Sequence, residues 1–152
     1  QKKYQYLFVY GTLKRDFHHE ALTHIMQDIE FAGESTISGI MYDIGEYPGA
    51  VPNMSTKIKG EVFKLLRPRR VIQFLDEYEG YDSAHLKQSE YLRRKEIIQL
   101  KEENVEAWIY WYNYPVDDKK VIRHQNYLDY VKFAKHREKQ KPAKLNKVNQ
   151  QA

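Results

Sequence analysis

Phe8-Val9-Tyr10-Gly11-Thr12-Leu13-Lys14 is an apolar strand pattern that runs into a glycine at the first turn of the chain. The residues from Tyr4 to Tyr10 are rich in aromatic and β-branched side chains, which favour a strand. A strand that ends in a glycine turn exposes successive backbone N–H groups, and these can hold a carboxylate or a developing oxyanion. We therefore expect an anion-holding turn early in the chain.

A second segment, Leu75-Asp76-Glu77-Tyr78-Glu79-Gly80, supplies carboxylates that such a turn can use. It ends a helix predicted over Pro68 to Tyr78, because proline suits the first helical position and Gly80 suits the position just past the last turn. The helix dipole and the neighbouring acids disfavour the ionised form of Glu79, so we expect a raised pKa useful for proton transfer. The alternative is an acidic helix end wholly in solvent.

The composition indicates a single domain without covalent cross-links. Of 152 residues, 41% are hydrophobic and 14% aromatic, which is enough for one packed core. Because cysteine is absent, disulfides, a thiol nucleophile and the usual zinc ribbons are excluded, and a reducing, cytoplasmic location is expected. No apolar run approaches the ~20 residues that cross a bilayer, and no signal-peptide core follows Gln1-Lys2-Lys3, so we expect neither membrane insertion nor export.

Positive charge is concentrated towards the C-terminal end. The net charge is +4, but from Lys132 onward there are seven Lys or Arg and one acid, Glu138, so this segment carries about +6 and the rest about −2. We predict a single domain over 1–138 and a basic tail over 139–152. The tail is interpreted as a solvated helix end and a disordered terminus, with an anionic partner as the alternative. Nucleic-acid binding is disfavoured, and the oligomeric state stays open.

The remaining patterns predict an α+β fold. Strands outnumber helices and follow one another in sequence, which favours a small mixed β-barrel flanked by helices. The predicted elements are a helix over 17–29, a strand over 31–44, a loop over 45–53, a strand over 57–66, a hairpin of strands 91–100 and 105–112, and a helix from 117 or 118 to 137.

Two further groups of residues are candidates for binding. Tyr91 and Arg93 alternate on a strand, so they share a face where a phenol and a guanidinium could orient a polar ligand; the alternative is an exposed ion pair. His18, His19 and His24 suggest a metal, but adjacent histidines point to different sides of a helix and no nearby cluster completes a site. We expect no metal and no cofactor.

Two nucleotide-related interpretations are weaker. The turn Gly11-Thr12-Leu13-Lys14 lacks the spacing of a phosphate-binding loop, so nucleotide binding is not expected. The aromatic run Trp108-Ile109-Tyr110-Trp111-Tyr112 could stack bases, but strand alternation buries about half of its rings in a core. Both segments are better explained by the fold.

Taken in order, these segments resemble the γ-glutamylcyclotransferase-like superfamily, which includes γ-glutamylamine cyclotransferases and avirulence-induced-gene-like proteins. The resemblance covers roughly Tyr6 to Tyr112, and the order and spacing of its pieces carry it. Those pieces are Val9-Tyr10-Gly11-Thr12-Leu13-Lys14, Gly39-Ile40-Met41-Tyr42-Asp43-Ile44-Gly45, Tyr47-Pro48-Gly49, Gly60-Glu61-Val62-Phe63, Leu75-Asp76-Glu77-Tyr78-Glu79-Gly80-Tyr81, Tyr91-Leu92-Arg93 and Ala107-Trp108-Ile109-Tyr110.

The resemblance implies a metal-independent enzyme that converts a small γ-glutamyl amine or peptide into 5-oxoproline and the free amine. By motif, Glu79 is the general acid/base and the glutamyl-binding turn consists of Tyr10, Gly11, Thr12 and Leu13. Holding the substrate folded favours its intramolecular ring closure. Loops 45–56 and 80–90 are expected to select the leaving amine, whose identity stays open. The alternative is a non-catalytic module that binds a small acid or an anionic partner.

Overall fold

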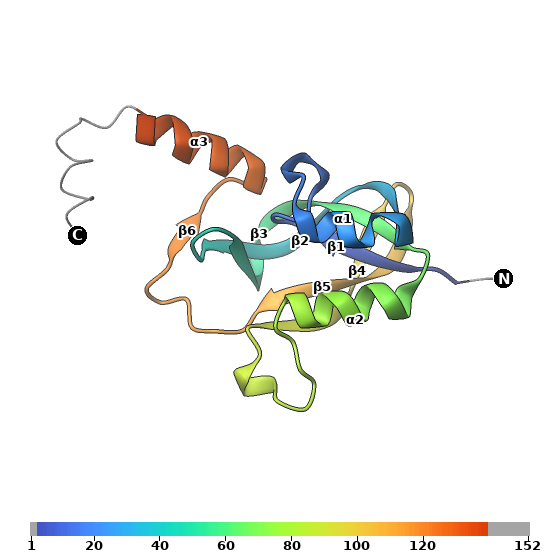
Figure 1. The fold of residues 1–152 in the computed structure, drawn as a ribbon. Helices are drawn as coiled ribbons and strands as arrows, with labels where there is room; N and C mark the ends of the chain where they lie inside the picture. Colours follow the sequence, from blue (N-terminus) through green and yellow to red (C-terminus); the bar gives the residue numbers. More distant parts are fainter. Residues whose placement is uncertain (1–2, 140–152) are drawn as a thin grey trace.

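One six-stranded sheet organises the fold of residues 3–139, the part of the chain that the computed structural model describes (Figure 1). Its strand order is β4-β5-β1-β3-β2-β6, and every neighbouring pair is antiparallel except the parallel pair β1 and β5. The strands are β1 (Gln5–Val9), β2 (Ile29–Asp43), β3 (Pro48–Leu65), β4 (Tyr91–Leu100), β5 (Glu103–Tyr112) and β6 (Lys120–Ile122).

The sheet curls into a half-barrel. Although β2 and β4 are not neighbours in the sheet, the Ser35 hydroxyl on β2 donates a hydrogen bond to the Gln99 carbonyl on β4 at 2.5 Å. The helices are α1 (Glu20–Ile25), α2 (Pro68–Tyr78) and α3 (Tyr127–Lys139), with 3-10 turns η1 (Arg15–Phe17), η2 (Met26–Asp28) and η3 (Leu86–Gln88). The predicted small mixed β-barrel with flanking helices is confirmed in this half-barrel form.

Alternation along β1 divides the core into two clusters. Leu7 and Val9 join the buried side chains of α1 and α2 on one face of the sheet, whereas Phe8 and Tyr10 join a cluster inside the half-barrel. In Figure 1, α1 and α2 run alongside the strands and α3 stands apart beyond β6. No helix among residues 3–139 is long and apolar enough to span a membrane.

The predicted hairpin of strands 91–100 and 105–112 is confirmed, and so is helix 68–78. The helix predicted over 17–29 is confirmed only over α1, because the rest of this segment forms η1 and η2 and then enters β2 at Ile29. His18 interrupts the helical path with a left-handed φ of 50°, and the His19 ring then accepts the Ala21 N–H at 3.0 Å and caps α1.

Two more predicted boundaries differ from the structure. The predicted loop 45–53 is confined to a short turn, because β3 begins at Pro48 and pairs back to Asp43. Apart from Gly45, the glycine and prolines that suggested a loop are paired with β2 within β3. A shift in the pairing register between Ser38 and Gly39 follows these pairs. The predicted C-terminal helix begins only at Tyr127, since Lys120–Ile122 pairs with β2 as β6. The predicted tail 139–152 lies outside the described residues apart from its first residue.

Candidate active site

The end of α2 fixes the position of Glu79. Gly80 has a φ of 69°, which favours glycine, and its N–H donates to the Glu77 carbonyl at 3.2 Å. The Tyr81 N–H reaches back to the Asp76 carbonyl at 2.8 Å, which completes a Schellman motif. The helix therefore stops abruptly, with Glu79 as its C-cap residue before the chain turns away.

The turn after β1 presents backbone donors. The Lys14 N–H donates to the Gly11 carbonyl at 3.1 Å and closes the turn. The N–H groups of Gly11, Thr12 and Leu13 have no acceptor among residues 3–139. Gly11 also packs so closely on Pro48 that a Cβ would lie 2.8 Å from the proline ring, which keeps any side chain away from this corner.

Paired charges outside the cavity hold the turn in place. The residue Glu61 is only 2% exposed. Its carboxylate accepts hydrogen bonds from the backbone N–H of Arg15 at 2.8 Å and from Nε of Arg15 at 3.2 Å. Buried Lys14 donates from Nζ to Asn126 at 2.7 Å, and the Asn126 oxygen also accepts the Leu128 N–H at the start of α3. Because Glu61 and Lys14 are both held by these contacts, they restrict how the turn can move.

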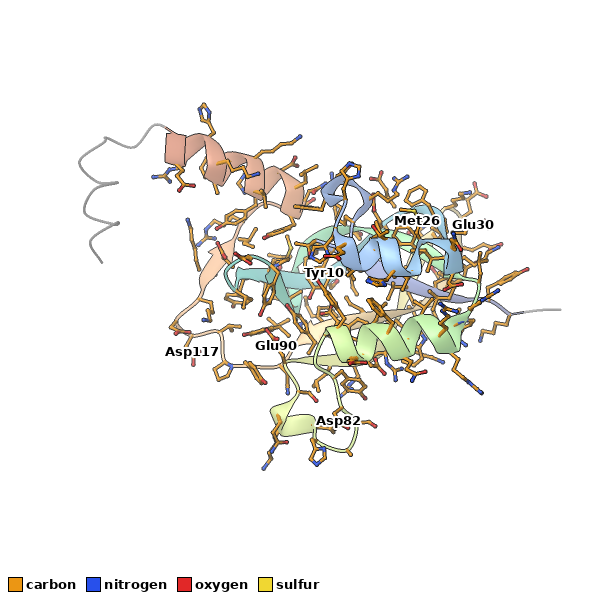
Figure 2. All side chains as sticks on the ribbon, viewed as in Figure 1. Tyr10, Met26, Glu30, Asp82, Glu90 and Asp117 are labelled. Carbon is orange, nitrogen blue, oxygen red and sulfur yellow. The ribbon has the colours of Figure 1, made fainter. Side chains whose placement is uncertain are left out.

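Both predicted segments meet at one cavity of about 260 Å³. Figure 2 labels Tyr10, which follows β1, and Glu90, which lies where the loop after α2 returns to the sheet. The residues that line the cavity are Phe8, Val9, Tyr10, Gly11, Thr12, Leu13, Tyr47, Pro48, Tyr78, Glu79, Glu90, Tyr91 and Tyr110. The turn, Glu79 and Tyr91 are therefore brought together, and Arg93 is not part of the lining.

Burial raises the pKa of Glu79 to about 8, and the negative charge of Glu90 contributes to the shift. The predicted direction is confirmed, but the two predicted acidic neighbours are not among its causes. Asp76 is neutralised by Arg93, and Glu77 is exposed. No group within residues 3–139 forms a hydrogen bond with the Glu79 carboxyl, so it is available to a ligand. A carboxyl with this pKa can accept and release a proton near neutral pH.

The phenols of the cavity wall are structural and neutral. The Tyr10 hydroxyl donates to the Tyr110 carbonyl at 2.8 Å and accepts the Ala50 N–H at 3.1 Å. The Tyr91 hydroxyl donates to the Pro48 carbonyl at 2.8 Å. Burial and the charge of Glu79 raise the pKa of the phenols that line the cavity, which are Tyr10, Tyr47, Tyr78, Tyr91 and Tyr110. At Tyr47 the main cause of the raised pKa is its hydrogen bond to Glu90.

Arg93 is engaged next to the cavity. Its Nε and Nη2 donate to the two oxygens of Asp76 at 2.7 and 3.2 Å, and its guanidinium lies 4.3 Å from the centre of the Trp108 ring. The Tyr110 hydroxyl donates to the same Asp76 at 2.7 Å. Arg93 on β4 thus connects the last turn of α2 to the sheet. It forms a bidentate ion pair with Asp76 and stacks on the Trp108 ring of β5.

Glu90 is the main residue that the sequence interpretation missed. Its N–H donates to the Gly80 carbonyl at 3.1 Å, so the loop after α2 closes with Glu90 beside Glu79. This closure depends on pairing across the loop 81–89, for which the sequence offers no local signal. Tyr47 and Pro48 were visible only as part of the Tyr47-Pro48-Gly49 motif.

The described residues contain no group of three or more His, Cys, Asp or Glu that could hold a metal ion. His19 instead caps α1 and contacts the Tyr78 hydroxyl at 3.2 Å. The His24 ring packs on Phe74 with ring centres 5.3 Å apart. Two of the three histidines that suggested a metal therefore have packing or capping contacts.

The comparisons with known proteins identify this half-barrel protein as γ-glutamylcyclotransferase-like. The sequence pattern of the family described as "Gamma-glutamyl cyclotransferase, AIG2-like" matches residues 7–129, and the chain belongs to this family. It is 32% identical over 124 residues to the gamma-glutamylcyclotransferase family protein YtfP of Escherichia coli (strain K12), covering 81% of this chain and 96% of that protein.

Solved structures show the same fold. The solution structure of YtfP from Escherichia coli superposes with a TM-score of 0.58 at 31% identity, covering 82% of this chain and 96% of that one. The crystal structure of an AIG2-like protein from Mus musculus gives a TM-score of 0.65 at 21% identity, covering 83% and 89% of the two chains. The second likeness is one of fold alone.

Proposed function

We propose that this protein converts a γ-glutamyl amine or peptide into 5-oxoproline and the free amine, with Glu79 as general acid/base. The observation that carries the proposal is that one cavity holds a carboxyl with a pKa of about 8 and three backbone N–H groups that have no acceptor within residues 3–139. Family membership supports the same reaction class.

Each step can be written with groups of this cavity. Glu79 in its carboxylate form takes a proton from the substrate α-ammonium, and the freed amine attacks its own γ-carbonyl carbon. A C–N bond forms, and the carbonyl electron pair moves to oxygen. When that pair returns, the bond to the leaving nitrogen breaks, and Glu79 gives its proton to that nitrogen. The Glu79 carboxylate then takes the second proton from the ring nitrogen and passes it to the released amine, which leaves as an ammonium. The atoms balance without water or a co-reactant.

The turn has a binding role in this scheme. The N–H groups of Gly11, Thr12 and Leu13 can hold either the substrate α-carboxylate or the developing oxyanion. Tyr10 and Tyr91 supply ring surface, since their hydroxyls are engaged with the backbone. Ring closure joins two groups of one molecule, so holding the glutamyl chain folded supplies much of the rate.

Arg93 has an indirect role in this proposal. Because its guanidinium is paired with Asp76, it acts as a positioning residue that holds the end of α2, and therefore Glu79, against the sheet. This differs from the contact with a polar ligand expected from the strand pattern. A change at Arg93 would then affect stability and the position of Glu79 together.

The test measures 5-oxoproline released from a panel of γ-glutamyl amines and peptides. We expect turnover by the wild-type protein, with and without EDTA, and a loss of at least 100-fold in Glu79→Gln. Glu77→Gln is the matched control, because Glu77 is exposed on the same helix end. Equal rates in wild type and Glu79→Gln would remove Glu79 from the mechanism, and binding without turnover of any compound would favour the non-catalytic module.

A further inference from the structure

The charged side chains of the cavity all have the same sign. Among the lining residues, Glu79 and Glu90 are the charged ones, and no Lys, Arg or His of residues 3–139 lines the cavity. Because the pKa of Glu79 is about 8, that residue is largely protonated at neutral pH. Glu90 is therefore the group that gives this cavity its negative charge.

Glu90 is held in a fixed position. Its N–H donates to the Gly80 carbonyl at 3.1 Å and its own carbonyl accepts the Asn113 N–H at 2.7 Å. One carboxylate oxygen accepts a hydrogen bond from the Tyr47 hydroxyl. The preceding Ser89 is buried, and its hydroxyl oxygen accepts the Asp82 N–H at 2.9 Å, which anchors the loop. The carboxylate of Glu90 is thus preorganised.

The surroundings of Glu90 differ from those of Glu79. Tyr47, which holds Glu90, is 36% exposed, so this part of the wall can be reached from solvent. The Tyr47 and Tyr91 ring centres are 6.4 Å apart, and the Tyr91 and Tyr112 ring centres are 5.3 Å apart. A carboxylate beside aromatic faces is a favourable environment for an organic cation and an unfavourable one for an anion.

We propose that Glu90 selects leaving amines that carry a second positive charge, so that the preferred substrates are γ-glutamyl derivatives of diamines or longer polyamines. The inference rests on the proposed function, because it assigns the glutamyl end to Glu79 and the 11–13 turn. With that end placed there, the amide substituent extends towards Tyr47 and Glu90. A cationic substituent gains an ion pair, whereas a substituent that ends in a carboxylate meets Glu90 without a compensating cation.

Three γ-glutamyl amides of matched length test the charge preference. They carry 4-aminobutyl, butyl or 3-carboxypropyl substituents, which end in an ammonium, a methyl group or a carboxylate. Dissociation constants are measured by calorimetry on the Glu79→Gln protein, in which turnover is prevented. We expect the cationic amide to bind about tenfold more tightly than the neutral amide, and the anionic amide to bind more weakly than both.

Adding Glu90→Gln to this protein should reduce the preference for the cationic over the neutral amide to less than twofold. The matched control is Glu46→Gln, because Glu46 is exposed next to Tyr47 and outside the lining, and it should keep the preference. If the Glu90→Gln protein does not fold, the preference is measured against added NaCl in Glu79→Gln, where screening should weaken it.

Two results would overturn the inference. Glu90→Gln could weaken the binding of all three amides equally, which would mean that Glu90 holds the α-ammonium that they share. The Glu79→Gln protein could also bind the three amides with equal affinity, or fail to bind the cationic amide. The proposed function fails by a separate observation, namely the absence of 5-oxoproline when the wild-type protein is incubated with these amides.

Discussion

Replacing Glu79 by glutamine should make the protein more stable at alkaline pH. The pKa of Glu79 is raised from 4.5 to about 8, chiefly by burial. An acid with a higher pKa in the folded state holds its proton more tightly when folded. Its stabilising contribution is therefore complete below about pH 4.5 and is lost as the pH rises through about 8. Glutamine has a similar shape and no charge, so it avoids this loss.

The size of the effect follows from the shift. Moving a pKa from 4.5 to about 8 corresponds to about 5 kcal/mol of difference between the folded and unfolded states. Because Glu79 is only half-buried as a residue and its cavity is open to solvent, roughly half of this difference should be observed. We expect Glu79→Gln to exceed the wild type by about 2–3 kcal/mol at pH 9 and to be close to it at pH 5.

Urea unfolding followed by tryptophan fluorescence between pH 5 and 9 measures this difference. The slope of the free energy of unfolding against urea concentration should be the same in both proteins, so that a difference in the unfolding midpoints reports a difference in stability. Glu77→Gln is the control, since its exposed carboxylate should leave the pH dependence of the wild type unaltered. Parallel curves for wild type and Glu79→Gln across this range would refute a buried, proton-holding Glu79.

Three further predictions concern catalysis and packing. In a 5-oxoproline assay, kcat/KM should rise with pH through about 8, because the base form of Glu79 is required. Glu90→Gln should move this inflection to lower pH, because it removes a negative charge that raises the pKa of Glu79. In urea unfolding, Arg93→Met should lose about 2 kcal/mol, and adding Asp76→Asn should recover part of the loss by removing the unpaired carboxylate. Gly60→Ala should cost about 2–3 kcal/mol by the same measurement, because a Cβ would lie 2.5 Å from a backbone carbonyl of β1.

The features that were predictable from sequence are those set by local chemistry. Proline at the start of α2 and Gly80 after its end determine the helix bounds through backbone geometry, and Gly80 has the φ of 69° that such an end needs. The run of aromatic and β-branched residues that ends at Tyr10 likewise predicts a strand, and the structure forms β1 there. The meeting of the 11–13 turn with Glu79 was expected only through the family resemblance, since no local pattern encodes it.

The features that sequence could not supply depend on pairing between distant segments. β3 begins at Pro48 because it pairs with β2, and this pairing outweighs the turn preference of its glycines and prolines. Glu90 reaches the cavity because its N–H bonds to Gly80 across a loop. Arg93 was expected to face a ligand, and its partner Asp76 could be identified only when α2 was seen against β4.

The distribution of paired and unpaired groups separates the ion pairs that shape the site from the groups that face its cavity. Behind the turn, Glu61 is satisfied by Arg15, and at the end of α2, Asp76 is satisfied by Arg93, so the ionic groups that shape the site are neutralised outside the cavity. Inside it, the backbone donors of 11–13 and the Glu79 carboxyl have no hydrogen-bond partner among residues 3–139. Under the proposed function, these are the groups that a substrate with both an acceptor and an acidic proton would engage.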